Sequence, residues 1–326
     1  MRVLIIKLGA LGDAIVATPA IRAIIEAHPQ NNLSLLTSTE YAELFSGLEN
    51  VEIVSFPRHG IREALRCILW LRKKNFDRIY DLQSNDRSRL YCCLSGAKEK
   101  VGNHSLFPYT HHPGDKYTGQ THVSRRHKEA LQSIGIETKE LQPWLPVNKE
   151  TKARVADWLG KKTSNNKKLV LIHAGASHAH PQKRWPYFAE IGKKLCLSGF
   201  EIIWLGGKDE EELNAQLARV AGINATGEFG LGEIVELGKS ACFALTNDSG
   251  PMHLLSCANL PVYALFGPTD WRRYHALGQI DNVISLSKPS PVWSEESIAE
   301  MDKKNLSRLS PEMVWAVLAE LENITE

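Results

Sequence analysis

The sequence predicts an α/β protein with two successive domains, each built on a doubly wound parallel sheet. The length of 326 residues is about twice that of a common single domain. In both halves, short apolar runs alternate with segments of helical period, the order that builds parallel sheets. A polar stretch of low complexity at residues 161–168 separates the two sets. We therefore expect domains at residues 1–160 and 161–326.

The first half opens with the clearest strand of the chain. A strand is expected at residues 3–7, where Val3 to Ile6 form a continuous apolar run, as expected of a strand buried on both faces, and Lys7 follows. Residues 102–121 are rich in His, Pro, Gly and Tyr without a clear period, which indicates a long functional loop. The other strands of this half are expected at residues 33–37, 51–56 and 78–82, and its helices at residues 14–28, 61–74, 87–94 and 123–134.

The second half repeats the alternation and ends in a helix at residues 310–322. Ser310-Pro311-Glu312 supplies that helix with a cap, a first-turn proline and an acid. Two open sheets in succession place a ligand crevice between the carboxyl ends of both. The strands are expected at residues 169–174, 201–206, 241–246 and 261–266, and the earlier helices at residues 185–197, 209–221, 231–239 and 251–257.

Composition and charge narrow the class of protein. Hydrophobic residues make up 43% of the chain and charged residues 23%, an ordinary globular balance. No apolar run approaches the ~20 residues of a membrane span, and the first residues make a poor signal peptide. Six cysteines without CxxC spacing indicate reduced thiols, so we expect a cytoplasmic protein. The net charge is +2, and no motif of a nucleic-acid binder is present.

The first motif that carries chemistry is Lys7-Leu8-Gly9-Ala10-Leu11-Gly12-Asp13. Two glycines between a strand and a helix let the backbone approach a ligand, although the GxxGD spacing is not the dinucleotide fingerprint. Asp13 is a candidate general base at the start of a helix. The alternative is that it caps that helix.

The second motif is the segment from Thr246 to His253, where a buried strand meets a polar turn and Pro251 starts a helix. Free N–H groups at such a turn suit a pyrophosphate, and Asp248 and His253 would lie near the same anion. The alternative is a capped helix with a surface histidine.

Three further strand ends carry polar groups. Lys183 follows His173-Ala174-Gly175-Ala176-Ser177 and is a candidate for neutralising a leaving phosphate, or is only a solvated lysine beside a tryptophan. Asp209, after Gly206-Gly207-Lys208, suits ribose or base recognition, or caps a tight turn. Residues 266–270 end another strand and are consistent with a simple turn.

Little in the sequence supports a metal site or the active site of a serine hydrolase. His111, His112, His122 and His127, or His178 and His180, lack a recognised ligand spacing. No GxSxG motif is present. We therefore expect no metal and no cofactor.

Together these motifs resemble glycosyltransferase family 9, the heptosyltransferases of lipopolysaccharide synthesis. The resemblance implies a GT-B fold, in which two Rossmann-like doubly wound domains face a central cleft and the terminal helix returns toward the first domain. The matching segments extend over roughly residues 1–278 and are residues 6–13, 18–22, 81–83, 183–186, 246–254, 261–262 and 266–270.

The resemblance also implies an activity. It is an inverting, metal-independent transfer of heptose from ADP-L-glycero-D-manno-heptose to a Kdo/heptose-lipid A core acceptor, with the acceptor in the first domain and the donor in the second. Asp13 matches the catalytic aspartate, and Lys183 has both a catalytic and a donor-binding role. The other donor-binding positions are Gly12, Ser177, Asp209, Asp248, Ser249, Gly250 and His253.

This chain departs from the family pattern in two places. Gly9-Ala10 stands where some members have paired serines, and residues 287–302 contain no cysteine where many members have several. Three alternatives therefore stay open: another nucleotide-sugar or a non-core acceptor, a GT-B nucleotide-sugar epimerase, and a non-catalytic binding module. Asp13 and Lys183 together argue against the last.

Residues 98–128 are basic and contain Arg125, Arg126 and Lys128. Because the resemblance gives this domain to the acceptor, we expect these three residues to bind an acidic glycolipid. The alternative is a basic surface that touches anionic lipid on the inner face of the inner membrane.

Overall fold

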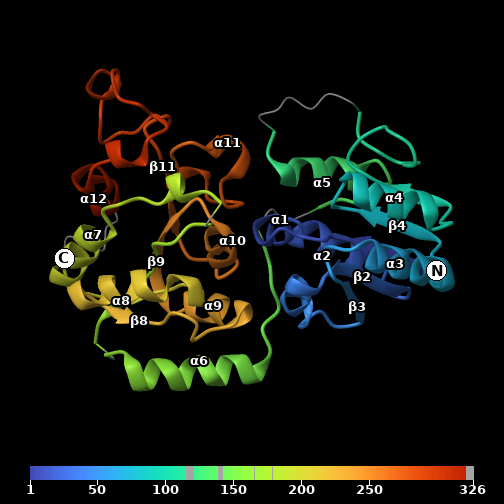
Figure 1. Ribbon diagram of the computed structural model, residues 1–326, viewed down its shortest axis with the longest axis horizontal. Coiled ribbons are helices and arrows are strands. Elements are labelled where there is room, and N and C mark those ends of the chain that lie inside the picture. The colour runs from blue at the N-terminus through green and yellow to red at the C-terminus, as the bar shows by residue number, and fades with distance from the viewer. Residues whose placement is uncertain (115–120, 139–141, 165, 178, 321–326) are drawn as a thin grey trace. The chain divides into compact units, whose positions relative to one another are not determined.

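The computed structural model describes residues 1–114, 121–138, 142–164, 166–177 and 179–320, and its chain divides into two compact α/β units (Figure 1). The units are Met1–Pro146 and Val147–Glu326. The division lies earlier than the expected boundary after residue 160, because an unpredicted helix, α6 (Lys149–Lys162), packs on α9 (Leu231–Gly238) of the second unit. Arg154 of α6 is hydrogen-bonded to the carboxylate of Glu233 and, at 2.6 Å, to the carbonyl oxygen of Glu228.

The first unit contains a parallel sheet with the strand order β3-β2-β1-β4-β5. The apolar run that opens the chain is the central strand, and Val3 to Ile6 are fully buried there. The strand order reverses between β1 and β4, so their carboxyl ends form a switch point of the kind at which open sheets bind ligands. The strands are β1 (Arg2–Ile6), β2 (Asn32–Ser38), β3 (Val51–Phe56), β4 (Arg78–Asp81) and β5 (Glu99–Val101).

One predicted helix of the first unit is two helices. Residues 14–28 were expected to form a single helix, but α1 (Leu11–Val16) ends at Ala17 and α2 (Thr18–Ala27) begins directly after it. Pro19 occupies the first turn of α2, where its missing N–H costs nothing. The other helices are α3 (Ile61–Lys74), α4 (Asp86–Leu94) and α5 (Val123–Gln132).

The loop predicted at residues 102–121 contains neither helix nor strand in its described part. An isolated bridge between Val101 and His111 and the hydrogen bonds of Thr110 with the backbone of Lys100 tie it to the sheet edge. Residues 115–120 lie outside the described residues.

The second unit contains a parallel sheet with the strand order β11-β10-β9-β6-β7-β8. Its switch point lies between β6 and β9. The two edge strands, β8 and β11, are each two residues long and were not predicted. The strands are β6 (Lys168–His173), β7 (Phe200–Trp204), β8 (Ile223–Asn224), β9 (Ala241–Asn247), β10 (Val262–Leu265) and β11 (Val283–Ile284), and the remaining helices are α7 (Phe188–Leu197), α8 (Glu211–Val220), α10 (Gly250–Ser256), α11 (Trp271–Tyr274) and α12 (Pro311–Ala319).

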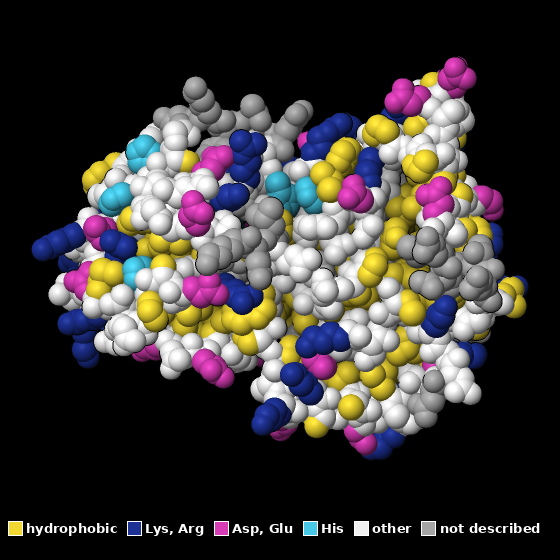
Figure 2. All heavy atoms as spheres, turned by 180° about the vertical axis from the view of Figure 1, so that it is seen from behind, with side chains coloured by type: hydrophobic (Ala, Val, Ile, Leu, Met, Phe, Trp, Pro, Cys, Tyr) yellow, Lys and Arg dark blue, Asp and Glu magenta, His cyan; other side chains and the backbone are white. Residues whose placement is uncertain are grey.

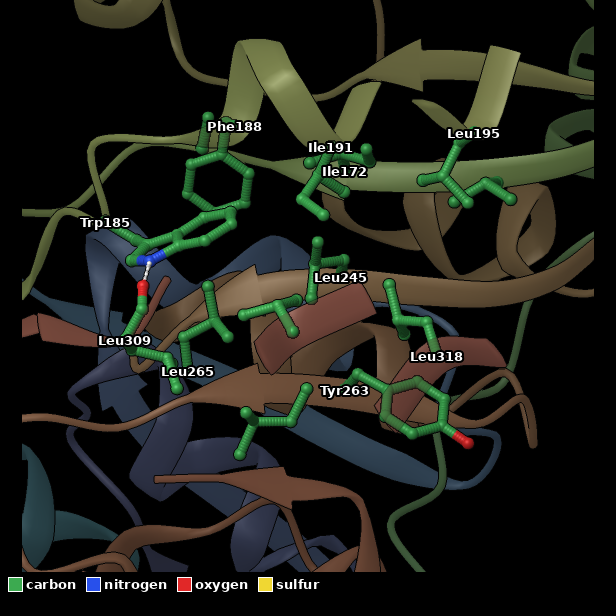
Figure 3. Packing of buried hydrophobic residues seen from close by; sticks show 14 of the residues in the cluster. Ile172, Trp185, Phe188, Ile191, Leu195, Leu245, Tyr263, Leu265, Leu309 and Leu318 are labelled. Atoms are coloured by element: carbon green, nitrogen blue, oxygen red, sulfur yellow. Dashed lines mark hydrogen bonds between the residues drawn. The ribbon is translucent and has the colours of Figure 1, made fainter. Parts of the chain in front are cut away.

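The core of the second unit fixes the segment that carries Lys183. Trp185 is buried against Phe188, and its indole Nε1 donates to the carbonyl oxygen of Leu309 at 2.7 Å (Figure 3). Val314 and Leu318 of α12 belong to the same core, so the terminal helix packs on its own unit. The expectation that this helix also returns to the first domain stays a prediction.

The face drawn in Figure 2 shows no single dominant charge. On the face drawn in Figure 2, Lys and Arg side chains are interspersed with Asp and Glu. Within the described residues, no helix has the length and apolar character needed to cross a bilayer.

Candidate functional site

The switch point of the second sheet brings three of the predicted motifs together. β6 pairs with β9, so the loops that follow the two strands start side by side. Asn247, buried at the end of β9, donates from Nδ2 to the carbonyl oxygens of Ala174 and Gly175, both at 2.9 Å. Its Oδ1 accepts from the backbone N–H of Trp185 at 3.0 Å. This one amide therefore holds the two loops in register.

Lys183 and Asp248 meet at this edge. Lys183 ends the 3-10 turn Pro181–Lys183, and its Nζ lies 2.6 Å from Asp248 Oδ2. The lysine side chain is 22% exposed and the aspartate side chain 9%. The ammonium is thus fixed by a buried carboxylate while one side of it stays open to solvent. A cation held in this way can bind a second anion without reorganising.

A buried carboxylate–imidazole–hydroxyl chain lies beside that pair. Glu210 Oε2 is 3.2 Å from His173 Nε2, and His173 Nδ1 is 3.3 Å from Ser249 Oγ. Burial raises the pKa of Glu210, but the hydrogen bonds from His173 and from the N–H of Gly207 outweigh it and hold the pKa below its usual range. Because an ionised carboxylate only accepts, His173 donates from Nε2, and Nδ1 can accept from the Ser249 hydroxyl.

Two glycines make room for Glu210. A Cβ on Gly175 would lie 1.3 Å from Glu210 Oε1, and a Cβ on Gly206 would lie 2.9 Å from its Oε2. Both glycines follow strand ends, β6 and β7, where the backbone passes over the carboxylate. Glu210 thus excludes a side chain at Gly175. At Gly206 it does so together with Asn214, whose Nδ2 would lie 2.5 Å from the added Cβ.

The acid predicted from the sequence is the residue next to Glu210. Asp209, the predicted ribose-binding acid, is exposed in the 3-10 turn Lys208–Glu210, whereas Glu210 is buried. The signal for Glu210 is the spacing Gly207-x-x-Glu210. This spacing is typical of a capping box, in which the glutamate carboxylate accepts from the backbone N–H of Gly207, just before the turn.

Three other predicted donor residues, Ser177, Gly250 and His253, follow β6 or β9. Ser177 is exposed and accepts from the N–H of Ala179 at 3.4 Å. Gly250 opens α10, and His253 follows in its next turn, half-buried. Asp270, in the fifth motif, caps α11 through the N–H of Arg272 at 3.1 Å, so that motif is a capped turn.

Asp13 does not cap its helix. The N-cap of α1 is Ala10, and Gly12 and Asp13 lie in the first turn, both half-buried. Among the described residues, no hydrogen bond is made to the Asp13 carboxylate. The alternative of a capping aspartate is therefore not supported, and the carboxylate is available to a substrate hydroxyl.

A buried lysine, which sequence reasoning missed as a functional residue, lies beneath Asp13. Lys7 Nζ donates to the carbonyl oxygen of Leu82 at 3.2 Å, and His127 Nε2 contacts the same oxygen at 3.1 Å. Burial lowers the pKa of Lys7, and the carboxylates of Asp13 and Asp81 oppose that shift. Burial and the Lys7 charge together lower the pKa of His127 to about 3. Lys7 thus places positive charge next to Asp13, and His127 stays neutral.

Asp81, at the end of β4, has a structural role. Its Oδ1 accepts from the N–H groups of Gln83 and Ser84, at 3.0 and 2.8 Å, and its Oδ2 accepts from Tyr109 Oη at 2.5 Å. Burial raises the pKa of Asp81, and the hydrogen bonds from Tyr109 and Ser84 oppose the shift. The side chain fixes the turn after β4 and the described part of the long loop.

Gly9 has a conformation that suits no other residue. Its φ is +122°, and a Cβ there would lie 2.3 Å from Cε2 of Tyr41. The Tyr41 ring therefore occupies the space that a serine side chain at position 9 would need. This contact and the positive φ account for the glycine at position 9, the first residue of the Gly9-Ala10 departure.

The predicted acceptor residues lie on α5. Arg125 is exposed and pairs with Glu129 at 2.8 Å, whereas Arg126 and Lys128 are half-buried on either side of the buried His127. The structure brings no three His, Cys, Asp or Glu side chains into a metal-binding cluster within the described residues. His178, one of the histidines considered for a metal, lies outside those residues.

Comparison with known proteins agrees with this architecture. The sequence model of glycosyltransferase family 9 (heptosyltransferase) matches residues 65–301. Lipopolysaccharide heptosyltransferase 2 of Escherichia coli is 28% identical over 294 residues, which cover 82% of this chain and 83% of the relative. Lipopolysaccharide core heptosyltransferase OpsX of Haemophilus influenzae is 21% identical, over 98% of this chain and 91% of the relative.

Solved structures show the same fold. A glycosyl transferase family 9 protein from Veillonella parvula superposes with a TM-score of 0.83 at 22% identity, covering 98% of this chain and 96% of the other. ADP-heptose lipopolysaccharide heptosyltransferase II of Escherichia coli superposes with a TM-score of 0.75 at 22% identity, covering 98% of each chain. The predicted GT-B fold is confirmed.

Proposed function

The chain belongs to glycosyltransferase family 9, and from this premise we propose that it transfers heptose from ADP-L-glycero-D-manno-heptose to a Kdo/heptose-lipid A acceptor of the lipopolysaccharide core. The transfer inverts the anomeric carbon and needs no metal ion. The matched relatives are a lipopolysaccharide heptosyltransferase and an ADP-heptose lipopolysaccharide heptosyltransferase, which supports ADP-heptose as the donor and lipopolysaccharide as the class of acceptor. The observation that carries the proposal is the 2.6 Å pair of Lys183 and Asp248 at the switch point of the second sheet.

The donor diphosphate binds at that switch point. Lys183 neutralises charge on the diphosphate as it leaves, the role that a divalent cation has in other sites. Ser249 and Gly250 bring a hydroxyl and an uncrowded backbone to the phosphates, and the Glu210–His173 pair orients the Ser249 hydroxyl. We assign Gly12, Ser177, Asp209 and His253 to the remaining donor contacts.

The acceptor is held by the first unit. Its hydroxyl oxygen attacks the anomeric carbon as the bond from that carbon to the ADP oxygen breaks, and Asp13 takes the hydroxyl proton. A single displacement of this kind inverts the configuration, and positive character on the sugar grows as the diphosphate departs. Lys7 and Asp13 attract each other electrostatically, which ties the buried lysine to the proposed base. Arg125, Arg126 and Lys128 bind the acidic groups of the glycolipid.

We place the enzyme in the cytoplasm, in peripheral contact with the inner face of the inner membrane where its lipid acceptor lies. The test is release of ADP by the purified protein in the presence of ADP-heptose, with and without a Kdo-bearing acceptor and with EDTA. Release that depends on the acceptor and survives EDTA supports the proposal. Conversion of the donor without an acceptor would indicate the epimerase alternative instead.

A further inference from the structure

Helix α3 (Ile61–Lys74) presents a stripe of aliphatic side chains to solvent. Ile61, Leu65 and Leu69 are 81%, 55% and 66% exposed. They recur every four residues, so they lie along one face of the helix. Three large aliphatic residues aligned in this way differ from the single exposed apolar residues that ordinary surfaces carry.

The side of α3 that carries Cys67 and Leu71 accounts for its place in the fold. Cys67 and Leu71 are buried in the core of the first unit, with Ala64 and Ile68 packed against it. The helix therefore has one apolar face for the core and a second that the core does not use. The exposed stripe is not needed for folding.

Positive charge borders the stripe. α3 contains five basic residues and one acidic residue, Glu63, which pairs with Arg66 at 3.1 Å. Arg62, Arg72 and Lys73 are exposed. Arg72 also donates from Nε to the carbonyl oxygen of Leu94 at the end of α4, which packs beside α3 (Figure 1).

We propose that this face of α3 docks the protein on an anionic lipid surface. Aliphatic side chains enter the boundary between headgroups and acyl chains, while Arg and Lys beside them meet lipid phosphates. A protein partner is less favoured, because residues that dominate protein interfaces are Trp, Tyr and Arg, whereas the apolar stripe here is aliphatic only. The inference deepens the proposed function, on which it rests for the choice of lipid, since the acceptor there is a glycolipid.

The test measures co-sedimentation of the full chain with vesicles of phosphatidylcholine, with and without phosphatidylglycerol, and without acceptor. The test variant is Leu65→Gln/Leu69→Gln. The matched control is Leu197→Gln, at a residue 80% exposed on α7 of the second unit. A second variant, Arg62→Gln/Lys73→Gln, removes charge and keeps the stripe. Circular dichroism melting checks that each variant folds, and sedimentation velocity gives the oligomeric state.

We expect the wild type and Leu197→Gln to bind anionic vesicles alike, and Leu65→Gln/Leu69→Gln to bind at least ~10-fold more weakly. Arg62→Gln/Lys73→Gln should lose ~5-fold per charge on anionic vesicles only. Failure of the wild type to bind, equal binding by the leucine variant, or a wild-type dimer that this variant dissociates would overturn the inference. Transfer to a soluble, delipidated acceptor should be the same in wild type and leucine variant. Loss of transfer in the wild type itself would count against the proposed function, not the docking face.

Discussion

Lys183 Nζ lies 2.6 Å from Asp248 Oδ2, and this contact joins the turn after β6 to the loop after β9. Each residue comes from a different motif, separated by 65 positions. Two strand ends that are far apart in sequence therefore form one anion site because their strands pair in the sheet.

Replacing Lys183 by Ala should lower kcat and raise the KM of the donor, by ~10²-fold or more in kcat/KM, because the departing diphosphate loses its counter-charge. Asp248→Ala should also weaken ADP binding, and the two changes together should be less than additive because the residues share one interaction. Lys193→Ala, at an exposed lysine of α7, is the control. Calorimetry that finds unchanged ADP affinity in both site variants would remove the donor site from this edge.

Gly175→Ala should destabilise the protein by about 1–3 kcal/mol, because the added Cβ displaces the buried Glu210 carboxylate. Gly232→Ala is the matched control: its Cβ meets nothing within 4 Å and it lies inside α9, so alanine should leave stability equal or higher. Denaturant melts of the two variants give the comparison. Equal stabilities of the two variants would show that the Glu210 carboxylate can adopt another position without cost.

His127 makes stability depend on pH in a defined window. Its pKa is lowered from 6.5 to about 3 in the folded chain, so folding favours the neutral ring. The contribution of His127 to the free energy of unfolding is complete above pH 6.5. It is lost as the pH falls toward 3, because the unfolded chain then binds a proton that the folded chain does not.

The wild type should therefore lose about 1 kcal/mol more than His127→Gln between pH 7 and pH 5.5. Glutamine keeps a donor for the Leu82 carbonyl oxygen and does not titrate. Urea melts of both proteins at the two pH values measure the difference. Equal losses of stability in the wild type and His127→Gln would mean that the His127 ring is protonated in the folded protein.

The main strands and the polar loops could be predicted from the sequence, because the signals for them lie within a few consecutive residues. The apolar run of β1 and the turn at Asn247 to Gly250 are visible without a structure. The break at Ala17 was missed although Pro19 lies inside the expected helix at residues 14–28, where a proline favours the first turn of a new helix. The strands β8 and β11 are too short to show a pattern.

The parts that could not be predicted depend on contacts between distant segments. Only the fold shows that Glu210, not Asp209, turns inward against Gly175, since the two acids are neighbours in the sequence. The packing of Tyr41 on Gly9 and the position of Lys7 below Asp13 are likewise set by strand pairing. The capping-box spacing from Gly207 is a local signal for Glu210 alone, and the other two contacts have none in the residue pattern.

Arg125→Ala/Arg126→Ala should raise the KM of the acceptor and leave the KM of the donor unchanged, even with a soluble, delipidated acceptor, because charge-assisted hydrogen bonds to its acidic groups are lost. The control is Arg219→Ala, at an exposed arginine of α8. Steady-state kinetics with each substrate varied in turn separate the two constants. If the variant uses the soluble acceptor as well as the wild type, these arginines contact lipid or solvent and the acceptor is bound elsewhere.

The most direct test of the account is mass spectrometry, with NMR for the anomeric configuration, of the product from a Kdo-bearing acceptor after incubation with ADP-heptose and either the wild type or Asp13→Asn, both in EDTA. We expect the wild type to add one heptose with inverted configuration. The variant should be slower by at least ~10²-fold, the scale of a positioned general base, with ADP affinity unchanged. A strict need for Mg²⁺ or Mn²⁺, retained configuration, or wild-type turnover by Asp13→Asn would contradict it.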